Sequence, residues 1–173
     1  MSGCRAGAWL GALVLTLCGT GVGAQDGLFP EQVRADRILV DKSERKLYLL
    51  KDGAILRSMD IALGLVPEGP KQREGDFRTP EGEYYLEAKN ADSDYFLSIK
   101  ISYPNERDRA RARALGVDPG GQIMIHGLPN APKYTEARYQ GWDWTDGCIA
   151  VSNSDMVDIW LMTAVSTPIE IRP

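Results

Sequence analysis

The stretch "KLYLLKDGAILRSMDIAL", residues 46–63, decides what kind of fold to expect. Residues 46–51 have the composition of a strand, and residues 54–63 predict a second strand directly after it. Between them stands Asp52-Gly53, a pair typical of a tight hairpin turn, because both central residues of that turn take positive φ angles. We therefore expect the chain to fold back here as two antiparallel strands.

Strands are also expected on both sides of this hairpin. Residues 64–82 and 128–147 are long and rich in turn-forming or aromatic residues, so we expect them to be loops. The other predicted strands cover residues 38–40, 83–88, 95–103, 122–127, 148–151 and 167–171. Their irregular order argues against a parallel βαβ sheet. The fold class that we predict is mainly β, a mixed and largely antiparallel β-domain with two or three short helices.

Two of these helices have clear boundary signals. Asn105 is expected to cap a helix over "ERDRARARAL", which Gly116 ends. Ser154 is expected to cap a last helix, in which Met156, Ile159 and Trp160 form one apolar stripe.

The first 24 residues have the pattern of a secretory signal peptide. Arg5 is followed by an apolar run too short to span a membrane, and small residues precede a cleavage point after Ala24. Lipidation at Cys18 is disfavoured because the bulky Leu17 precedes it. We therefore expect residues 25–173 to form one exported domain.

The net charge and the hydropathy of the chain limit the classes of partner that we expect it to bind. The chain has 20 basic and 24 acidic residues, a net charge of −4, and loss of Arg5 with the signal peptide makes it −5. This balance does not favour nucleic-acid binding, and no later apolar run is long enough for a membrane span. Contact with the membrane is expected only during export.

The counts of cysteine and histidine are informative. Cys4 and Cys18 would leave with the signal peptide, so Cys148 remains without an intramolecular disulfide partner. His126 is the one histidine in the chain, which makes a multi-histidine metal site a poor hypothesis. No metal and no organic cofactor are expected.

Cys148 and His126 both lie in turns bounded by glycine, at the two ends of the same predicted loop. Adjacent strands could bring them together as a nucleophile and its general base. Gly147 would then leave the backbone free to approach a substrate, so its N–H and that of Cys148 are candidate oxyanion donors. The alternative is that Cys148 is a small packing residue and His126 a structural hydrogen-bonding residue.

The segments "IMIHG" and "TDGCIAVSN", together with "GDFRTPEGEYYL", resemble the signature of the L,D-transpeptidase catalytic domain, the YkuD-like family. The sequence of residues 101–130 most resembles a Gram-negative branch of this family, which includes enzymes acting on murein-attached lipoprotein. The resemblance implies a β-rich fold and a cysteine that attacks a peptidoglycan stem peptide. A thioester forms at the third residue, often meso-diaminopimelate, as D-alanine leaves. It further implies Cys148 as nucleophile, His126 as base, and Gly147 in the oxyanion hole.

Two positions depart from that signature. Asp146 stands where the family usually has a second histidine, and Ala150 stands where arginine or asparagine is common. A carboxylate at residue 146 could orient His126 or could raise the pKa of the Cys148 thiol. A solvated turn aspartate is the other interpretation.

Further residues are weaker candidates for substrate contacts. They are Arg78 in the "GDFRTPEG" loop and the aromatic residues Tyr139, Trp142 and Trp144, which with Tyr134 could form a lid or a small separate core. The arginines of "ERDRARARA" recur at every second position, so a helix spreads them around its surface rather than into one anion site.

The expected function is that of an exported cysteine L,D-transpeptidase acting on peptidoglycan stem peptides, with transfer of the acyl group to an amine. A peptidoglycan hydrolase of the same fold is the first alternative; it would pass the acyl group to water, trimming stem peptides or releasing murein-bound lipoprotein. An inactive wall-binding module is an alternative of another class, motivated by Asp146 and Ala150.

Overall fold

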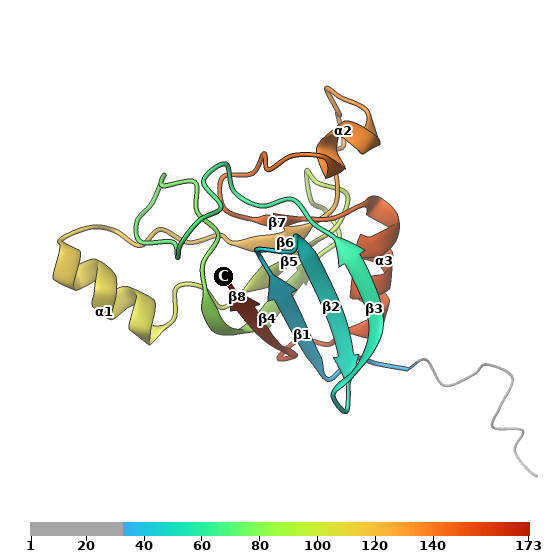
Figure 1. Cartoon of the computed structure of the whole chain (residues 1–173), viewed down its shortest axis with the longest axis horizontal. Helices are drawn as coiled ribbons and strands as arrows, with labels where there is room; N and C mark the ends of the chain where they lie inside the picture. The colour runs from blue at the N-terminus through green and yellow to red at the C-terminus, as the bar shows by residue number, and fades with distance from the viewer. Residues whose placement is uncertain (1–32) are drawn as a thin grey trace, which may run out of the picture. The chain divides into compact units, whose positions relative to one another are not determined.

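The structure, a computed structural model, describes residues 33–173 (Figure 1). The predicted signal peptide, with Cys4 and Cys18, lies outside these residues. Eight strands are present in the described part: β1 Arg37–Asp41, β2 Lys46–Lys51, β3 Ala54–Asp60, β4 Gly82–Asn90, β5 Ser98–Ile101, β6 Met124–His126, β7 Ile149–Ala150 and β8 Pro168–Arg172. Three helices accompany them: α1 Glu106–Leu115, α2 Glu136–Gln140 and α3 Asn153–Met162.

The strands form one mixed sheet in the order β3-β2-β1-β8-β4-β5-β6-β7. β1 pairs with β8, and β6 with β7, in parallel, while the other neighbouring pairs are antiparallel. The hairpin predicted at Asp52-Gly53 joins β2 to β3. Asp52 and Gly53 both have the positive φ angles that the turn requires, 50° and 80°. The predicted fold class, mainly β and largely antiparallel, is confirmed.

The two outer strands of the sheet are brought toward each other by the chain that follows β3. Ala62 and Ala150 exchange two backbone hydrogen bonds of 2.9 Å, so the segment after β3 lies alongside β7. The sheet therefore curls toward a barrel (Figure 1). This contact places residues 61–64 beside the strand that follows Cys148.

The core lies inside the curl and is lined by alternating residues of the strands. Fully buried side chains come from every part of the sheet, including Ile38, Leu49, Leu86, Ile125 and Ile169. Burial of such aliphatic side chains is the main stabilising contribution, about 1.5–3 kcal/mol for each.

Helix α3 packs on this core through the buried Met156 and Ile159. Trp160, expected on the same stripe, is only partly buried and lies under the ammonium group of Lys89, 5.2 Å from the ring centre. The N-cap of α3 is Ser152 rather than the predicted Ser154, and its hydroxyl accepts a hydrogen bond from the Asp155 N–H at 3.0 Å. The predicted boundary was therefore two residues late.

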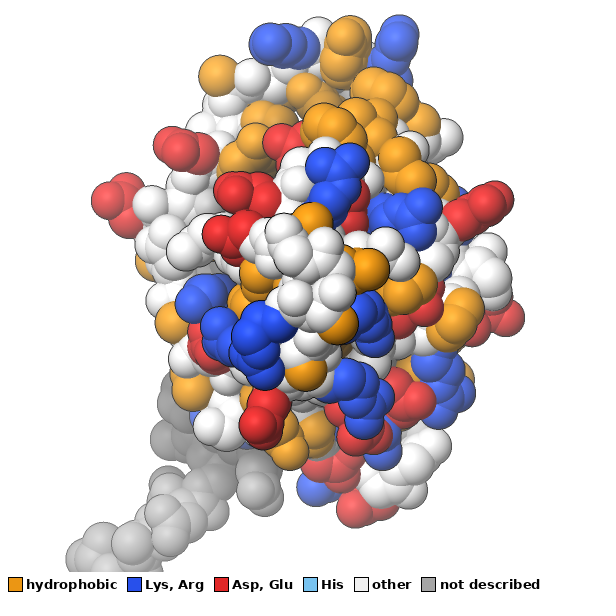
Figure 2. All heavy atoms as spheres, turned by 90° about the vertical axis from the view of Figure 1, so that its left-hand side faces the viewer, with side chains coloured by type: hydrophobic (Ala, Val, Ile, Leu, Met, Phe, Trp, Pro, Cys, Tyr) orange, Lys and Arg blue, Asp and Glu red, His pale blue; other side chains and the backbone are white. Residues whose placement is uncertain are grey.

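Helix α1 begins and ends where the sequence predicts. Asn105 and Asp108 form a capping box, and Gly116 ends the helix in the left-handed conformation. Asp108 is buried and accepts a hydrogen bond from the Tyr84 hydroxyl at 3.0 Å, which ties α1 to β4. Figure 2 shows the side of the molecule that carries α1, and basic and acidic side chains are interspersed over it rather than gathered in one patch.

Candidate active site

Strand β6 ends at His126, and Cys148 directly precedes strand β7. The pairing of these two strands brings the histidine and the cysteine together. The parallel register pairs His126 with Ala150, two residues after Cys148. Since side chains two residues apart in an extended chain point to the same face, Cys148 and His126 share a face of the sheet. Both line a pocket of about 260 Å³. Its wall consists of Ser93, Tyr95, Ser98, Gln122, Met124, His126, Trp144, Thr145, Asp146 and Cys148.

His126 is held in one tautomer by the backbone. It is 4% exposed, and its Nδ1 lies 2.7 Å from the carbonyl oxygen of Gly127. Because a carbonyl can only accept, Nδ1 must carry the proton, and Nε2 keeps the lone pair of a base. Burial lowers the pKa of His126 below 6.5, and the bond to Gly127 opposes this shift. The imidazole is therefore neutral at neutral pH.

Two aromatic rings fix the imidazole plane. The ring centre of Tyr95 lies 4.5 Å from that of His126, and the ring centre of Trp144 lies 5.7 Å away, edge to face. The Tyr95 and Trp144 rings are themselves stacked at 6.2 Å. The base thus has a packed environment that restricts rotation about its side-chain bonds.

Cys148 is a partly exposed free thiol. Its Sγ lies 3.6 Å from the carbonyl oxygen of Gln122, a weak hydrogen bond that the thiol donates. Burial raises the pKa of Cys148, and the Asp146 carboxylate raises it further. A backbone hydrogen bond from Met124 and the charge of Lys71 lower the pKa, but the net shift is upward. The resting pair is accordingly a neutral thiol beside a neutral imidazole.

Gly147 is required by its surroundings. Its φ angle is +127°, and a Cβ atom would lie 2.6 Å from the carbonyl oxygen of Arg78. The close approach predicted for this glycine is therefore made to the backbone of the 64–82 loop. Its N–H, expected to be an oxyanion donor, donates to the Thr145 hydroxyl at 3.1 Å, and that hydroxyl donates to the Cys148 carbonyl at 2.8 Å. In this structure the Gly147 N–H is thus already bonded within the turn.

Asp146 lies in the pocket but does not orient His126. Its side chain is exposed, and it forms no hydrogen bond or ion pair with any residue of 33–173. The orienting contact of His126 is the Gly127 carbonyl instead. Of the interpretations left open for Asp146, this geometry does not support the one in which it orients His126, because the Nδ1 proton is bonded to the Gly127 carbonyl.

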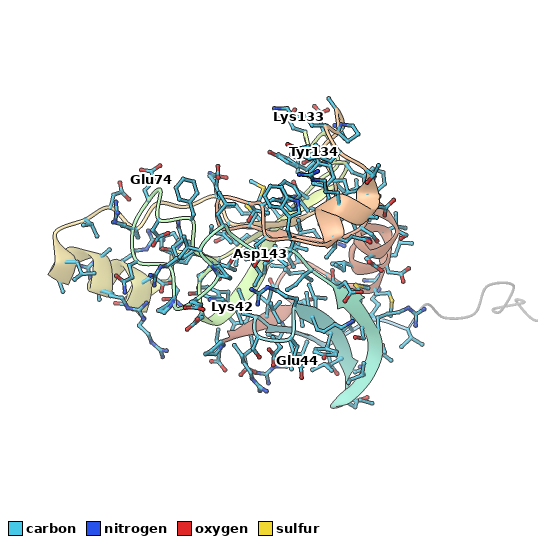
Figure 3. The ribbon with its side chains drawn as sticks, turned by 45° about the horizontal axis from the view of Figure 1, so that its top comes forward. Lys42, Glu44, Glu74, Lys133, Tyr134 and Asp143 are labelled. Atoms are coloured by element: carbon cyan, nitrogen blue, oxygen red, sulfur yellow. The ribbon has the colours of Figure 1, made fainter. Side chains whose placement is uncertain are left out.

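The other predicted substrate contacts are distributed unevenly. Trp144 lines the pocket, and Tyr139 is buried behind it with ring centres 5.0 Å apart. Trp142 is 43% exposed and packs on Tyr134, away from the pocket wall. The guanidinium of Arg78 lies toward Gly69, so only its backbone approaches the site. Figure 3 shows Tyr134 near α2, with Asp143 further along the same segment.

Sequence reasoning missed Tyr95 and Ser98. Both belong to the predicted strand 95–103, which in the structure starts only at Ser98. Ser98 pairs with His126 in the β5–β6 register, so it is brought to the site by sheet pairing alone. Tyr95 precedes a residue with positive φ, Phe96, and that bend turns its ring onto His126. No local pattern identifies either contact.

A buried ion pair stabilises the loop that packs against Gly147. Lys71 and Asp76 are 2.9 Å apart, and their side chains are 4% and 9% exposed. Asp76 also accepts hydrogen bonds from the backbone N–H groups of Gln72, Arg73 and Arg78. This carboxylate therefore sets the shape of the loop whose Arg78 carbonyl abuts Gly147.

A larger pocket, of about 330 Å³, lies beside the β1–β2 turn, and neither cysteine nor histidine lines it. Its buried cation, Lys42, is already bonded to Glu81 at 2.7 Å and to the carbonyl of Gly69 at 2.8 Å. The Cys148 pocket is the better site for chemistry, although it is the smaller of the two.

Within residues 33–173, no helix has the length and apolar character needed to cross a bilayer. No group of three or more histidine, cysteine, aspartate or glutamate side chains in the same range could hold a metal ion.

Comparison with known proteins identifies the family. Residues 35–171 match the YkuD L,D-transpeptidase catalytic domain, which covers most of the chain, so the protein belongs to the YkuD L,D-transpeptidase catalytic domain family. A relative from Escherichia coli strain K12, named "Putative L,D-transpeptidase YafK", is 44% identical over 61 residues, which are 34% of this chain and 23% of YafK.

Solved structures share the fold. The helical cell shape determining protein Pgp2 of Campylobacter jejuni is 28% identical, with a TM-score of 0.59 over 79% of this chain and 46% of that one. Bd1075 of Bdellovibrio bacteriovorus is 26% identical, with a TM-score of 0.54 over 78% of this chain and 46% of that one. An L,D-transpeptidase from Mycobacterium smegmatis, 15% identical over 79% of this chain and 58% of that one, has the same fold at a TM-score of 0.53. The chain thus spans about half the length of Pgp2 and Bd1075, and the match to YafK covers less than a quarter of that protein.

Proposed function

We propose that the protein is an exported cysteine L,D-transpeptidase that acts on peptidoglycan stem peptides in the periplasm or cell wall. The observation that carries this proposal is the arrangement of Cys148 and His126 in one pocket, with the His126 tautomer fixed so that Nε2 is the base. Membership of the YkuD family supports the reaction class.

The first step follows from the neutral state of both groups. The Cys148 thiol gives its proton to Nε2 of His126 while Sγ attacks the carbonyl carbon of the third residue of the stem peptide. In the imidazolium that forms, Nδ1 keeps its proton and continues to donate it in the hydrogen bond to the Gly127 carbonyl. Since the Gly147 N–H is bonded to Thr145, the Cys148 N–H is the backbone donor that we assign to the oxyanion.

The second step completes the transfer. His126 returns its proton to the departing nitrogen of D-alanine, which leaves a Cys148 thioester. An amine of a second stem peptide then attacks the thioester carbonyl, loses a proton to Nε2, and the thiol is restored. If water attacks instead, the same residues hydrolyse the thioester, and the protein trims stem peptides or releases murein-bound lipoprotein.

Incubation with tetrapeptide-containing muropeptides, followed by mass analysis of the products, tests the proposal. New cross-links or exchange of the terminal D-alanine indicate transfer, whereas shortened or released stems alone indicate hydrolysis. Cys148→Ala is expected to abolish all of these products. If Cys148→Ala forms the same products as wild type, Cys148 is not the nucleophile and the proposed mechanism fails. If neither protein forms any product, the enzymatic proposal fails and the inactive wall-binding module is favoured.

A further inference from the structure

We propose that Asp146, together with the rings of Tyr95 and Trp144, forms a subsite for a primary ammonium group of a diamino-acid substrate. This inference rests on the proposed function and specifies which chemical group the Cys148 pocket selects. It assigns a role to the residue that departs most clearly from the family signature, where histidine is usual.

The charge of the pocket supports a cation. Among the described residues that line it there is no lysine or arginine, and the neutral His126 adds no charge. Asp146 is the one lining residue with a carboxylate side chain. A substrate group with a positive charge is therefore stabilised next to the Asp146 carboxylate.

The Asp146 carboxylate is also available for binding. It is exposed and has no hydrogen-bond or ion-pair partner within residues 33–173. Asp143, three residues earlier, is fully engaged: it bonds the Arg45 guanidinium at 2.8 Å and accepts the Leu63 N–H at 2.8 Å. Within this turn segment, Asp143 stabilises the fold, whereas Asp146 lines the pocket.

The aromatic rings favour the same class of ligand. Tyr95 is 39% exposed and is stacked with Trp144 at an interplanar angle of 27°. Faces of tyrosine and tryptophan attract ammonium groups through the ring quadrupole. Burial raises the pKa of Tyr95, and nearby groups, Asp146 among them, raise it further.

The ammonium group could come from the side chain of the diamino acid in the acyl donor or from the acceptor. Both sources present the same chemistry, and two arms of one experiment distinguish them. The variants are wild type, Asp146→Asn, which removes the charge, and Asp146→Glu, which keeps it. Asp143→Asn is not a suitable control because Asp143 supports the fold.

In the donor arm, the rate of Cys148 thioester formation is followed by intact-protein mass for two tetrapeptides. One has the free side-chain amine of the diamino acid, and in the other this amine is acetylated. We expect acetylation to slow the wild type about tenfold, the effect of removing one charge-assisted hydrogen bond. Asp146→Asn should abolish this discrimination, and Asp146→Glu should keep part of it. Comparing the two peptides within each variant cancels the effect of Asp146 on the Cys148 thiol.

In the acceptor arm, the ratio of transfer to hydrolysis is measured with an acceptor diamino acid and with an acceptor that has a single amine. Asp146→Asn is expected to lower the preference for the diamino acceptor about tenfold. A loss of discrimination in either arm supports the subsite and identifies its source. Equal behaviour of wild type and Asp146→Asn in both arms overturns it.

Failure of the proposed function is distinguishable from failure of the subsite. If no variant forms a thioester with either peptide, the enzymatic proposal fails. The subsite is then tested by calorimetric titration of Cys148→Ala, with and without Asp146→Asn, using the same two peptides. Tighter binding of the free amine that depends on Asp146 supports the subsite, and equal binding of both peptides overturns it.

Discussion

At the scale of single residues, the site combines two neutral groups rather than a resting ion pair. The pKa of Cys148 is raised and that of His126 is lowered, both mainly by burial. A thiolate–imidazolium pair needs the opposite shifts, so the thiolate forms only as the attack proceeds. Alkylation at low pH, which an ion pair would allow, is not expected here.

The pH dependence of alkylation checks this state. We expect the midpoint for Cys148 to lie above the value of about 8.5 for an exposed thiol. Lys71→Met should move it upward, because Lys71 lowers the Cys148 pKa, and Asp146→Asn should move it downward. Lys71→Arg keeps the charge and should stay close to wild type. Fast alkylation of the wild type well below pH 8 would contradict the assignment.

His126 should act as the base over a wide pH range on the acidic side of neutrality. His126 must be neutral to accept the thiol proton, and its lowered pKa keeps it neutral at pH 6.5. The rate of thioester formation is therefore expected to fall only below pH 6.5. A profile of kcat/KM against pH measures this limb, and a midpoint above 7 would show that the imidazole is not buried as described.

Gly147 allows a sharp test of the turn that presents the nucleophile. In Gly147→Ala, a methyl group 2.6 Å from the Arg78 carbonyl and a φ of +127° are both unfavourable. We expect a loss of about 2 kcal/mol or more in the free energy of unfolding, together with loss of activity. Gly121→Ala is the matched control, since no atom lies within 4 Å of its added Cβ. Equal stability of the two variants would refute the packing argument.

At the scale of elements, the sequence predicts those segments whose signals are local. The hairpin at Asp52-Gly53 and the helix between Asn105 and Gly116 were predicted correctly because turn and capping residues determine them. The strand predicted over 95–103 was too long, since its first part bends toward His126. Helix α2 was missed inside the predicted 128–147 loop because five residues give too little periodicity.

The candidate site shows the same division. Cys148, His126 and Asp146 could be chosen from the sequence because rare residue types and a family signature mark them. Their roles could not be assigned fully: the partner of His126 is a backbone carbonyl, which every residue has. Tyr95 and Ser98 reach the pocket only through sheet pairing and a bend, which no short window of sequence contains.

Asp143 connects the segment before Cys148 to the sheet through an ion pair and a hydrogen bond. This carboxylate joins Arg45 of the β1–β2 turn to the Leu63 N–H. Asp143→Ala leaves that N–H unsatisfied, so we expect a loss of about 1–3 kcal/mol in denaturant unfolding. Asp158→Ala, which removes an exposed pair with Arg57, should cost less than about 0.5 kcal/mol. Equal costs would mean that Asp143 is not a structural fastening.

At the scale of the whole molecule, the curl of the sheet is what assembles the site. β6 supplies the base, and the residue directly before β7 is the nucleophile. The chain after β3 closes on β7 through Ala62, and the 64–82 loop packs behind Gly147. Segments far apart in sequence thus meet at one edge of the sheet (Figure 1). The family shares this fold, and in this chain Asp146 is the one carboxylate among the described residues that line the pocket.

Catalysis by this site requires that Cys148 becomes acylated with His126 as its base. The most direct measurement is the intact mass of the protein after incubation with a stem tetrapeptide, followed by peptide mapping of the adduct. We expect an adduct of the tripeptide acyl group on Cys148, absent in Cys148→Ala and strongly reduced in His126→Ala. An adduct on another residue, or the same amount of adduct in His126→Ala as in wild type, would contradict it.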